Sequence, residues 1–320
     1  MKILITGAAG LYGVHLTDLL CRQRWVRQVI GVDDFSRKFF TKDPFIKSPS
    51  FDRKFKLLKM KYQGLTVKQI DDYDFDIIVH LAAGISIPES MAKPEDYFNN
   101  NEYGTFQFIH KLLKTRRHPL FIYASTPEVY GNPQYVPMDI HHPMDPRSIY
   151  AVTKLAAEKH CEALRKWYDY PMIIIRNFNT FGENQNIGNY SAVIPAFIKN
   201  ALVGEDLKIE SDGSQTRDFQ YVKDAVRAYM LIIRNRECTQ GKIFNIGTGK
   251  QTSIKNLAEL IIKLSDSDSK IVFKPSRAID LYSLEADFSE TTKLVGWKPD
   301  YSLAEGLKKT IKWYRKYILR

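Results

Sequence analysis

The chain has few cysteines, and none of them is spaced for a disulfide framework or a metal centre. Cys21, Cys161 and Cys238 lie far apart among the 320 residues, and no CxxC pair occurs. Such spacing indicates neither cross-linked loops nor a zinc site. We therefore expect no metal in the functional site.

Long apolar runs, repeats and low-complexity tracts are also absent. No run approaches the ~18 apolar residues of a membrane-spanning helix, so we expect no membrane span. The opening MKILITG is short, apolar and basic, as a secretory leader would be, but it runs straight into glycines that we interpret as functional. Since cleavage would remove part of that site, we expect a cytoplasmic protein.

Acidic residues are fewer than basic ones, 36 against 47, which gives a formal net charge of +11. Nucleic-acid binding would require these charges to cluster beside exposed aromatic residues or within a known module. They are instead scattered, with only short groups such as residues 114–117. We expect no nucleic-acid partner, and a positive field also suits a substrate that carries phosphates.

The first half of the chain alternates short, continuous apolar runs with helical patterns. This alternation predicts an α/β fold, a doubly wound parallel sheet with helices on both faces, because strands buried on both faces are apolar throughout. The expected strands are residues 2–6, 28–34, 75–83, 120–125 and 172–178. The expected helices begin at about Val14 and span residues 103–113 and 151–167.

After about Asn177 the pattern changes to longer loops with glycine and asparagine. Helices are expected over residues 192–202 and 254–264. We predict a first domain over residues 1–176. A smaller C-terminal α/β lobe follows over residues 177–320, with some segments returning to the first domain.

The first expected strand ends in the sequence TGAAGLYG, where Gly7, Gly10 and Gly13 are spaced by three. Between a strand and a helix, the first glycine permits a tight turn and the second lets the backbone approach a pyrophosphate. The third lets the helix pack close to the strand. The N–H groups that open the helix then point at the phosphates. This context predicts a Rossmann-type dinucleotide site.

The second expected strand leads to Asp33, 20 residues beyond Gly13. A carboxylate at this place accepts hydrogen bonds from the adenosine ribose hydroxyls and repels a 2′-phosphate. Arg37 and Lys38 follow closely and weaken this preference, since either could meet a phosphate. We predict NAD as the cofactor.

Tyr150 is the one tyrosine of 18 that is followed four residues later by a lysine, Lys154. On a helix this spacing places both side chains on one face. An ammonium near a phenol stabilises the phenolate and lowers the phenol's pKa. Such a tyrosine can take a proton from an alcohol while hydride leaves the adjacent carbon for a nicotinamide.

Together these motifs resemble those of the extended short-chain dehydrogenase/reductase family, specifically its NAD-dependent nucleotide-sugar epimerases and dehydratases. The resemblance covers essentially the whole chain. The matching pieces are TGAAGLYG, VDD, HLAA, NEYGT, STPEVYG, YAVTK, RNFNTFG, DGSQTRDFQYV and NIGTG. It implies a nucleotide-diphosphate sugar as substrate. It also implies a homodimer in which helices 103–113 and 151–167 of two subunits form a four-helix bundle.

The resemblance further implies roles for single residues. Thr126 would hydrogen-bond the sugar hydroxyl at carbon 4, Tyr150 would act as the base, and Lys154 would hold the nicotinamide ribose. The implied cofactor contacts are Gly7, Gly10, Leu11, Tyr12, Gly13, Asp33, Asp34, Leu81, Ala82, Ala83, Asn101, Tyr150 and Lys154. The implied substrate contacts are Ser86, Asn179, Val193, Arg217 and Arg277. The two arginines would pair with phosphate oxygens, and a surface ion pair is the alternative for each.

The chain departs from the family in residues 59–64, KMKYQG, where relatives carry an aspartate that touches adenine. We expect adenine to be held by the loop around Lys61 and Tyr62 instead.

A second departure lies between Thr126 and Glu128, where Pro127 replaces the acid or serine of dehydratase relatives. Proline has no proton to donate and fixes the backbone, which argues against elimination of water. Glu128 remains as a catalytic base near carbon 5, and a carboxylate that takes a proton can also return it. Its alternative role is to orient a neighbouring group or to pair with a buried backbone group. We favour a 4-epimerase over a 4,6-dehydratase.

Two further alternatives are less favoured. A sugar-acid decarboxylase would carry an arginine in the C-terminal lobe, and residues 281–289 contain none. A NAD-binding regulatory protein that has lost catalysis would show a broken catalytic set, whereas Thr126, Tyr150 and Lys154 are all present.

Overall fold

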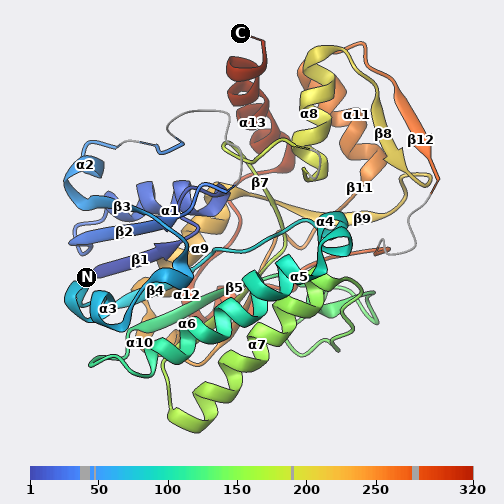
Figure 1. Ribbon diagram of the computed structural model, residues 1–320. Coiled ribbons are helices and arrows are strands. Elements are labelled where there is room, and N and C mark those ends of the chain that lie inside the picture. Colours follow the sequence, from blue (N-terminus) through green and yellow to red (C-terminus); the bar gives the residue numbers. More distant parts are fainter. Residues whose placement is uncertain (37–43, 47, 189–190, 276–280, 320) are drawn as a thin grey trace.

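The computed structural model describes residues 1–36, 44–46, 48–188, 191–275 and 281–319 (Figure 1). Seven parallel strands form its central sheet. They are β1 (Lys2–Thr6), β2 (Gln28–Asp33), β3 (Phe55–Lys59), β4 (Ile77–His80), β5 (Leu120–Ser125), β6 (Met172–Asn177) and β10 (Ile243–Ile246). Their order across the sheet is β10-β6-β5-β4-β1-β2-β3, so the predicted doubly wound α/β fold is confirmed.

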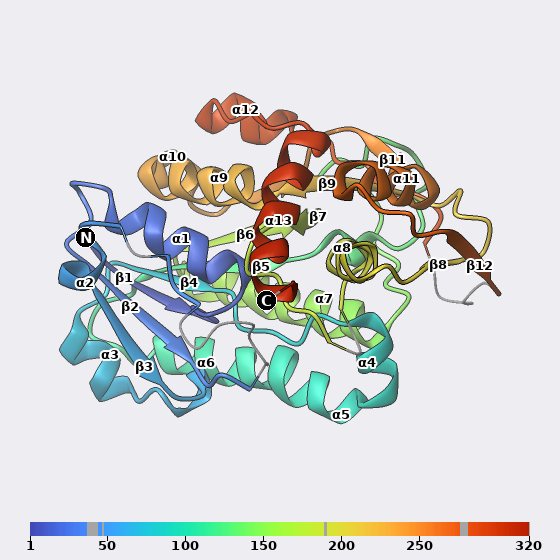
Figure 2. The same ribbon diagram turned by 90° about the horizontal axis from the view of Figure 1, so that it is seen from above.

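Helices cover both faces of this sheet (Figure 2). One face carries α1 (Leu11–Cys21) and α9 (Val222–Arg234), and the other carries α3 (Val67–Tyr73), α6 (Gly104–Leu112) and α7 (Ile149–Tyr168). Alternate residues of β1 enter different cores: Ile3 and Ile5 lie on the α1 side, and Leu4 lies on the α6 side. Burial on both faces is the physical reason for the continuous apolar runs.

The C-terminal half adds a smaller unit. Its three-stranded sheet has the order β11-β9-β7, with β7 (Asn179–Phe181), β9 (Thr216–Tyr221) and β11 (Gln251–Ser253). A parallel pair joins β8 (Leu207–Glu210) to β12 (Ile271–Lys274), and the main helices are α8 (Val193–Val203), α11 (Ile254–Ser265) and α13 (Leu303–Ile318). Since β10 comes from this half yet joins the large sheet, the division at residue 176 stays a prediction.

Short elements complete the described chain. They are α2 (Phe51–Lys54), α4 (Ile87–Ala92), α5 (Pro94–Tyr97), α10 (Arg236–Thr239) and α12 (Ser289–Val295), the 3-10 turns Tyr62–Gly64 and Pro127–Tyr130, and the π-turn Phe98–Tyr103. Within the described ranges, every helix is too short or too polar to cross a membrane.

The strand order determines where a ligand can bind. On one side of β1 lie β2 and β3, and on the other lie β4, β5 and β6, so the chain reverses its direction of winding at β1 and β4. Open α/β sheets bind ligands at the carboxyl ends of the strands beside such a switch point.

Candidate active site

The turn between β1 and α1 has the shape of a phosphate cradle. Gly7 adopts a φ of +70°, and a Cβ built there would lie 2.8 Å from the backbone nitrogen of Ala82. A side chain at Gly13 would overlap the carbonyl oxygen of Gly7. The N-cap of α1, Gly10, makes no side-chain hydrogen bond to the first N–H groups of the helix. This open, positive helix end fits a pyrophosphate.

Gly10 also explains one difference from the sequence-based expectation. Its backbone is extended, with φ −74° and ψ 174°, and the helix begins directly after it at Leu11 rather than at Val14. The first helical turn therefore starts inside the glycine motif itself, which brings its N–H groups close to the turn.

Asp33 ends β2 beside this turn. Its carboxylate accepts hydrogen bonds from the backbone N–H groups of Ala9 and Phe35, each at 2.9 Å. Asp34 accepts one from Ser36 at 3.0 Å. Asp33 thus links the end of β2 to the cradle, at the place where a ribose contact is expected. Arg37 and Lys38 lie outside the described residues.

The segment after β4 forms the other wall of the cradle. The backbone nitrogen of Leu81 donates to the carbonyl of Thr6 at 3.1 Å, and that of Ala82 donates to Thr6 Oγ1 at 3.3 Å. Asn101 holds the next residues, since its Oδ1 accepts from Gly84 N at 2.8 Å and its Nδ2 donates to Gly84 O at 2.9 Å. The structure thus gives Asn101 a loop-positioning role, and its direct contact with the cofactor stays a prediction.

His80, at the end of β4, is a residue of this site to which the sequence analysis assigned no role. Its Nδ1 lies 2.7 Å from Thr6 Oγ1 and its Nε2 lies 3.1 Å from Thr105 Oγ1. Because the Thr105 hydroxyl donates to the Asn101 carbonyl at 2.7 Å, it must accept from Nε2–H. Burial, aided by the positive charge of Lys154, lowers the pKa of His80 to about 3. A neutral imidazole therefore connects β1, β4 and α6.

Tyr150 and Lys154 lie one turn apart at the start of α7, and both are buried. The Nζ of Lys154 donates to the carbonyl of Ala124 at 2.6 Å and lies 4.2 Å from the centre of the Tyr123 ring. Burial lowers the pKa of Lys154 to about 7, and the negative charge of Glu158 opposes this effect. The ammonium is thus fixed at the carboxyl end of β5.

Two residues outside the motifs hold Tyr150 in place. The Oγ of Ser90 accepts from the backbone nitrogen of Tyr150 at 3.1 Å and donates to the Ile87 carbonyl at 2.7 Å. The Tyr97 ring meets the Tyr150 ring edge-on, with centroids 6.4 Å apart, and its hydroxyl accepts from Ser86 N at 2.9 Å. Ser86, a predicted substrate contact, also caps α4. Tyr150, the predicted base, is therefore held by the same segment that carries Ser86, the predicted substrate contact.

Thr126 follows β5 directly. It is buried, and its Oγ1 accepts from the backbone nitrogen of Glu128 at 3.3 Å, which caps the turn Pro127–Tyr130. Pro127 is itself buried at the first position of that turn. Since α7 packs against both β5 and this turn, Tyr150 and Lys154 at the start of α7 lie on an element that meets Thr126 at this strand end.

Three buried polar atoms near this strand end have no hydrogen-bond partner among the described residues. They are Ser125 Oγ at the end of β5, Asn177 Oδ1 at the end of β6 and Asn179 Nδ2 at the start of β7. Buried polar groups in folded proteins are nearly always satisfied. The orphaned atoms therefore fit polar ligands, such as a nicotinamide and a sugar, at the switch point.

The remaining predicted contacts are more widely spread. Arg217 lies on β9, and its Nη1 donates to the carbonyls of Thr216 at 2.8 Å and Leu281 at 2.9 Å. Val193 is the first residue of α8. Tyr12, on α1, donates its hydroxyl hydrogen bond to Thr180. Predicted contact Arg277 lies outside the described residues.

Tyr62 does not offer a surface for adenine. Its ring meets those of His80 and Phe108 edge-on, with centroids 4.7 and 5.6 Å away, and its hydroxyl donates to the Asn100 carbonyl at 2.5 Å. The structure places this ring in the core on the α6 side. Lys61 is exposed beside it, and the expectation that the loop around Lys61 and Tyr62 holds adenine stays a prediction.

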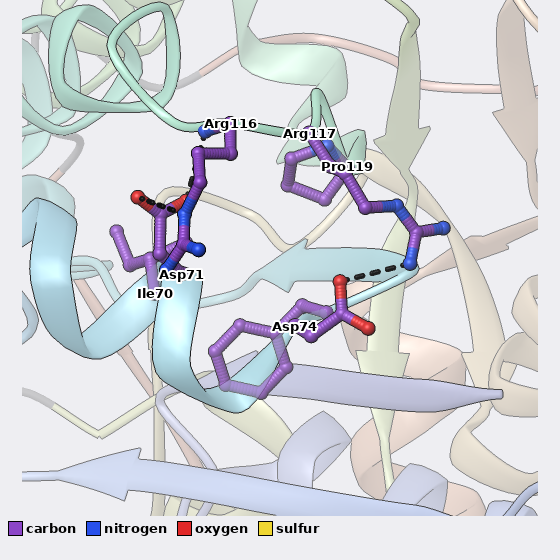
Figure 3. A pocket seen from close by; sticks show the side chains of 7 residues that line it. Ile70, Asp71, Asp74, Arg116, Arg117 and Pro119 are labelled. Atoms are coloured by element: carbon purple, nitrogen blue, oxygen red, sulfur yellow. Dashed lines mark hydrogen bonds and ion pairs between the residues drawn. The ribbon is translucent and has the colours of Figure 1, made fainter.

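A hollow of about 300 Å³ lies elsewhere, between α3 and the segment that leads into β5 (Figure 3). Its arginines are already paired: Arg117 contacts Asp74 at 2.8 Å and Arg116 contacts Asp71 at 3.5 Å. It lies at the amino end of β5, away from Tyr150. The described part of the chain contains no group of three or more His, Cys, Asp or Glu residues placed for a metal ion.

With this geometry established, the chain can be compared with known proteins. It matches the NAD dependent epimerase/dehydratase family over residues 3–247. It is 30% identical to the UDP-glucose 4-epimerase of Mycolicibacterium smegmatis over 316 residues, covering 98% of this chain and 99% of the relative. It is 32% identical to UDP-glucuronic acid decarboxylase 1 of Xenopus tropicalis over 322 residues, covering 99% of this chain and 73% of the relative.

A solved structure is also similar. The UDP-glucuronic acid 4-epimerase of Bacillus cereus, in complex with UDP-glucuronic acid and NAD, matches with a TM-score of 0.91 and 29% identity, covering 99% of both chains. The chain belongs to the NAD-dependent epimerase/dehydratase family. It is therefore an enzyme with NAD as cofactor, as the glycine turn and the tyrosine–lysine pair predicted. Its relatives catalyse different reactions, so membership leaves the reaction to be argued from the site.

Proposed function

We propose that the protein is a nucleotide-sugar 4-epimerase that acts through a 4-keto sugar. The observation that carries this proposal is the gathering of Thr126, Tyr150 and Lys154 at the end of β5, with Pro127 beside the threonine. Thr126 orients the sugar hydroxyl at carbon 4, and Tyr150 takes its proton. NAD bound at the glycine turn would supply the redox chemistry, uptake of hydride from carbon 4 and its return to the other face of the sugar.

Lys154 makes Tyr150 usable as a base. In a buried site, an ammonium stabilises a nearby phenolate more strongly than it would in water. Tyr150 can thus accept a proton in the forward direction and return it in the reverse direction, which a reversible epimerisation requires.

The turn after β5 supports epimerase over dehydratase. Elimination of water needs an acid for the departing hydroxyl, and Pro127 is a buried proline without a side-chain proton. Glu128 favours the 4,6-dehydratase as the second candidate, because one carboxylate could serve as base and then as acid. An epimerase needs neither step, so the residues of the site suffice for it.

The relatives and the position of Arg217 on β9 support the proposed substrate class. The similar proteins named above carry UDP-glucose and UDP-glucuronic acid in their names. We propose a UDP-sugar whose diphosphate is held by Arg217 and Arg277. We also propose that the protein works in the cytoplasm.

We further propose a homodimer built on α6 and α7. These helices lie side by side in Figure 1. Val152 on α7 is 44% exposed, and the exposed rings of Phe98 and Tyr103 stack on each other 6.2 Å apart just before α6. Exposed apolar side chains on neighbouring helices favour burial against a second copy.

The proposal is tested by product analysis in deuterated water. Purified protein is incubated with UDP-, dTDP-, GDP- and CDP-sugars, and products are identified by NMR. We expect a 4-epimer of a UDP-sugar without deuterium at carbon 5. A stable 4-keto-6-deoxy sugar with deuterium at carbon 5 would identify a dehydratase, and release of carbon dioxide from a sugar acid would identify a decarboxylase.

A further inference from the structure

One ion pair is completely buried beside the catalytic helix. Glu158 on α7 and Arg176 on β6 have side chains that are 0% exposed, with Arg176 Nη2 2.7 Å from Glu158 Oε2. The Nε of Arg176 also donates to Glu158 Oε1 at 3.1 Å. The contact is thus the two-pronged form in which a guanidinium fixes a carboxylate most firmly.

Arg176 is held on its other side as well. Its Nη1 donates to the hydroxyl of Tyr130 at 2.8 Å and to the carbonyl of Ile140 at 3.2 Å. The Tyr130 hydroxyl donates in turn to Asn245 Oδ1 at 2.7 Å. This chain of bonds ties α7 to β6, β10 and the turn after Thr126, so Glu158 has little freedom to move.

The position of Glu158 indicates a role for this ion pair beyond packing. It lies four residues beyond Lys154, on the same face of α7, with Tyr150 a further turn away. A buried ion pair is seldom more stabilising than apolar residues of the same volume. Because this ion pair lies one helical turn from the buried ammonium of Lys154, its position indicates an electrostatic role.

We propose that Glu158, fixed by Arg176, is a positioning residue for the proposed epimerase chemistry: its carboxylate keeps Lys154 charged and thereby keeps Tyr150 acidic. This inference rests on the proposed function and adds Glu158 as the residue that supports the tyrosine–lysine pair electrostatically.

The other groups near Lys154 do not supply this charge. The titratable side chains that face it are His80 from β4, Tyr123 from β5, and Tyr150, Glu158 and Cys161 from α7. Burial lowers the pKa of His80 to about 3, so it is neutral, and burial raises the pKa of Tyr123 and of the Cys161 thiol, so they are neutral too. Among the described residues, Glu158 is thus the negative charge that offsets the burial of Lys154.

The test removes the pair without leaving a lone buried charge. The double variant Glu158→Leu with Arg176→Met keeps the approximate volume, and Glu158→Gln with Arg176→Gln is a polar second version should the first fail to fold. The variant Glu158→Asp keeps the charge. The matched control is Lys159→Gln with Glu162→Gln, which removes an exposed pair, 2.9 Å apart, from the same helix.

The readout is the ultraviolet absorbance of the phenolate during a pH titration of the NAD-loaded protein. For each protein, the curve of its Tyr150→Phe counterpart is subtracted, which isolates Tyr150. The background is favourable because burial raises the pKa of many other tyrosines. These are Tyr12, Tyr62, Tyr123, Tyr130, Tyr170, Tyr221, Tyr229 and Tyr314.

We expect the pKa of Tyr150 to rise by about one pH unit in either double variant, and to change little in Glu158→Asp and in the control. Lys154 lies one turn nearer to Tyr150 than Glu158 does, so losing the ammonium outweighs losing the carboxylate. The acid limb of kcat should move by the same amount, with KM for the nucleotide sugar unchanged.

A folded double variant with a wild-type Tyr150 titration would overturn the proposal and leave Glu158 as a structural residue. Absence of any Tyr150-dependent transition near neutral pH in the wild-type protein would instead count against the proposed function. Because the titration does not depend on turnover, the two failures are distinguishable.

Discussion

At the residue scale, Tyr150 depends on neighbours from three different elements. Lys154 approaches from the next turn of α7, Ser90 holds its backbone from α4, and the ring of Tyr97 supports it from α5. Each contact restricts the phenol to one place beside the end of β5. A base that must meet a sugar hydroxyl at hydrogen-bond distance needs such restriction.

Replacing Tyr150 by phenylalanine removes the proton acceptor while keeping the buried ring. We expect kcat to fall by ~10²–10⁴-fold, the usual contribution of general acid–base catalysis, with NAD still bound. Turnover of the UDP-sugar and NAD content of the purified protein are measured together. The control is Tyr168→Phe, at the exposed end of the same helix. A Tyr150→Phe variant as active as this control would contradict the assigned base.

His80 makes a prediction about stability rather than activity. Its pKa is about 3 in the folded protein and 6.5 in a free side chain. Below pH 6.5 this histidine is therefore protonated in the unfolded chain but neutral in the folded protein. The free energy of unfolding falls as the pH falls towards 3. The slope from this one group is about 1.4 kcal/mol per pH unit.

The measurement is urea unfolding of the wild type and of His80→Gln, from about pH 6 down to about pH 4. Glutamine keeps a donor and an acceptor for the neighbouring threonines but has no titration. We expect a shallower loss of stability with acid in the variant. Parallel curves would show that His80 is not held neutral.

At the element scale, the turn between β1 and α1 combines two constraints at Gly7: a positive φ and close contact with the backbone of Ala82. Gly296 shares the first constraint, with φ +67°, but a Cβ there would meet nothing within 4 Å. Gly296→Ala therefore measures backbone strain alone, about 1–2 kcal/mol. Gly7→Ala should lower the free energy of unfolding by more than this. The variant should also bind little NAD, as measured by isothermal titration calorimetry. Equal effects of both variants would contradict the tight cradle.

The expected elements and the observed ones agree best where one physical signal dominates. Continuous apolar runs located β1 and β5 to the residue, because burial on both faces leaves no other pattern. The helix α7 extends two residues earlier than expected, to Ile149, because Ser148 caps it by accepting from Ala151 N. The short helices α4 and α5 were not expected, since they depend on tertiary contacts of Ser90 and Tyr97 rather than on periodicity.

The residues of the site likewise divide into those that the sequence could predict and those that it could not. Tyr150 and Lys154 could be named from their spacing, which puts them on one helix face. Thr126 could be named from its place after an expected strand and from the family resemblance. The burial of Tyr62 could not, since it depends on α6 packing over β4. A buried ion pair at Arg176 could have been predicted from the sequence, because a charge inside the apolar run of β6 requires a buried partner. That partner is Glu158.

At the scale of the whole molecule, the outer face of α6 and α7 decides the oligomeric state. Val152→Arg places a charge in the proposed interface and should shift the protein to monomers in sedimentation at micromolar concentration. Val203→Arg on α8 is the matched control, because Val203 is 45% exposed and Val152 44%. A wild-type monomer, or a dimer that survives Val152→Arg unchanged, would contradict the four-helix interface.

The account as a whole depends on the bond that breaks at carbon 4 of the sugar. The most direct measurement uses a UDP-sugar carrying deuterium at carbon 4, incubated with the protein in ordinary water and followed by NMR. The account predicts a 4-epimer that keeps the deuterium at carbon 4, and no product with Tyr150→Phe. Loss of the label to water, or its appearance at carbon 6 of a 4-keto-6-deoxy sugar, would contradict it.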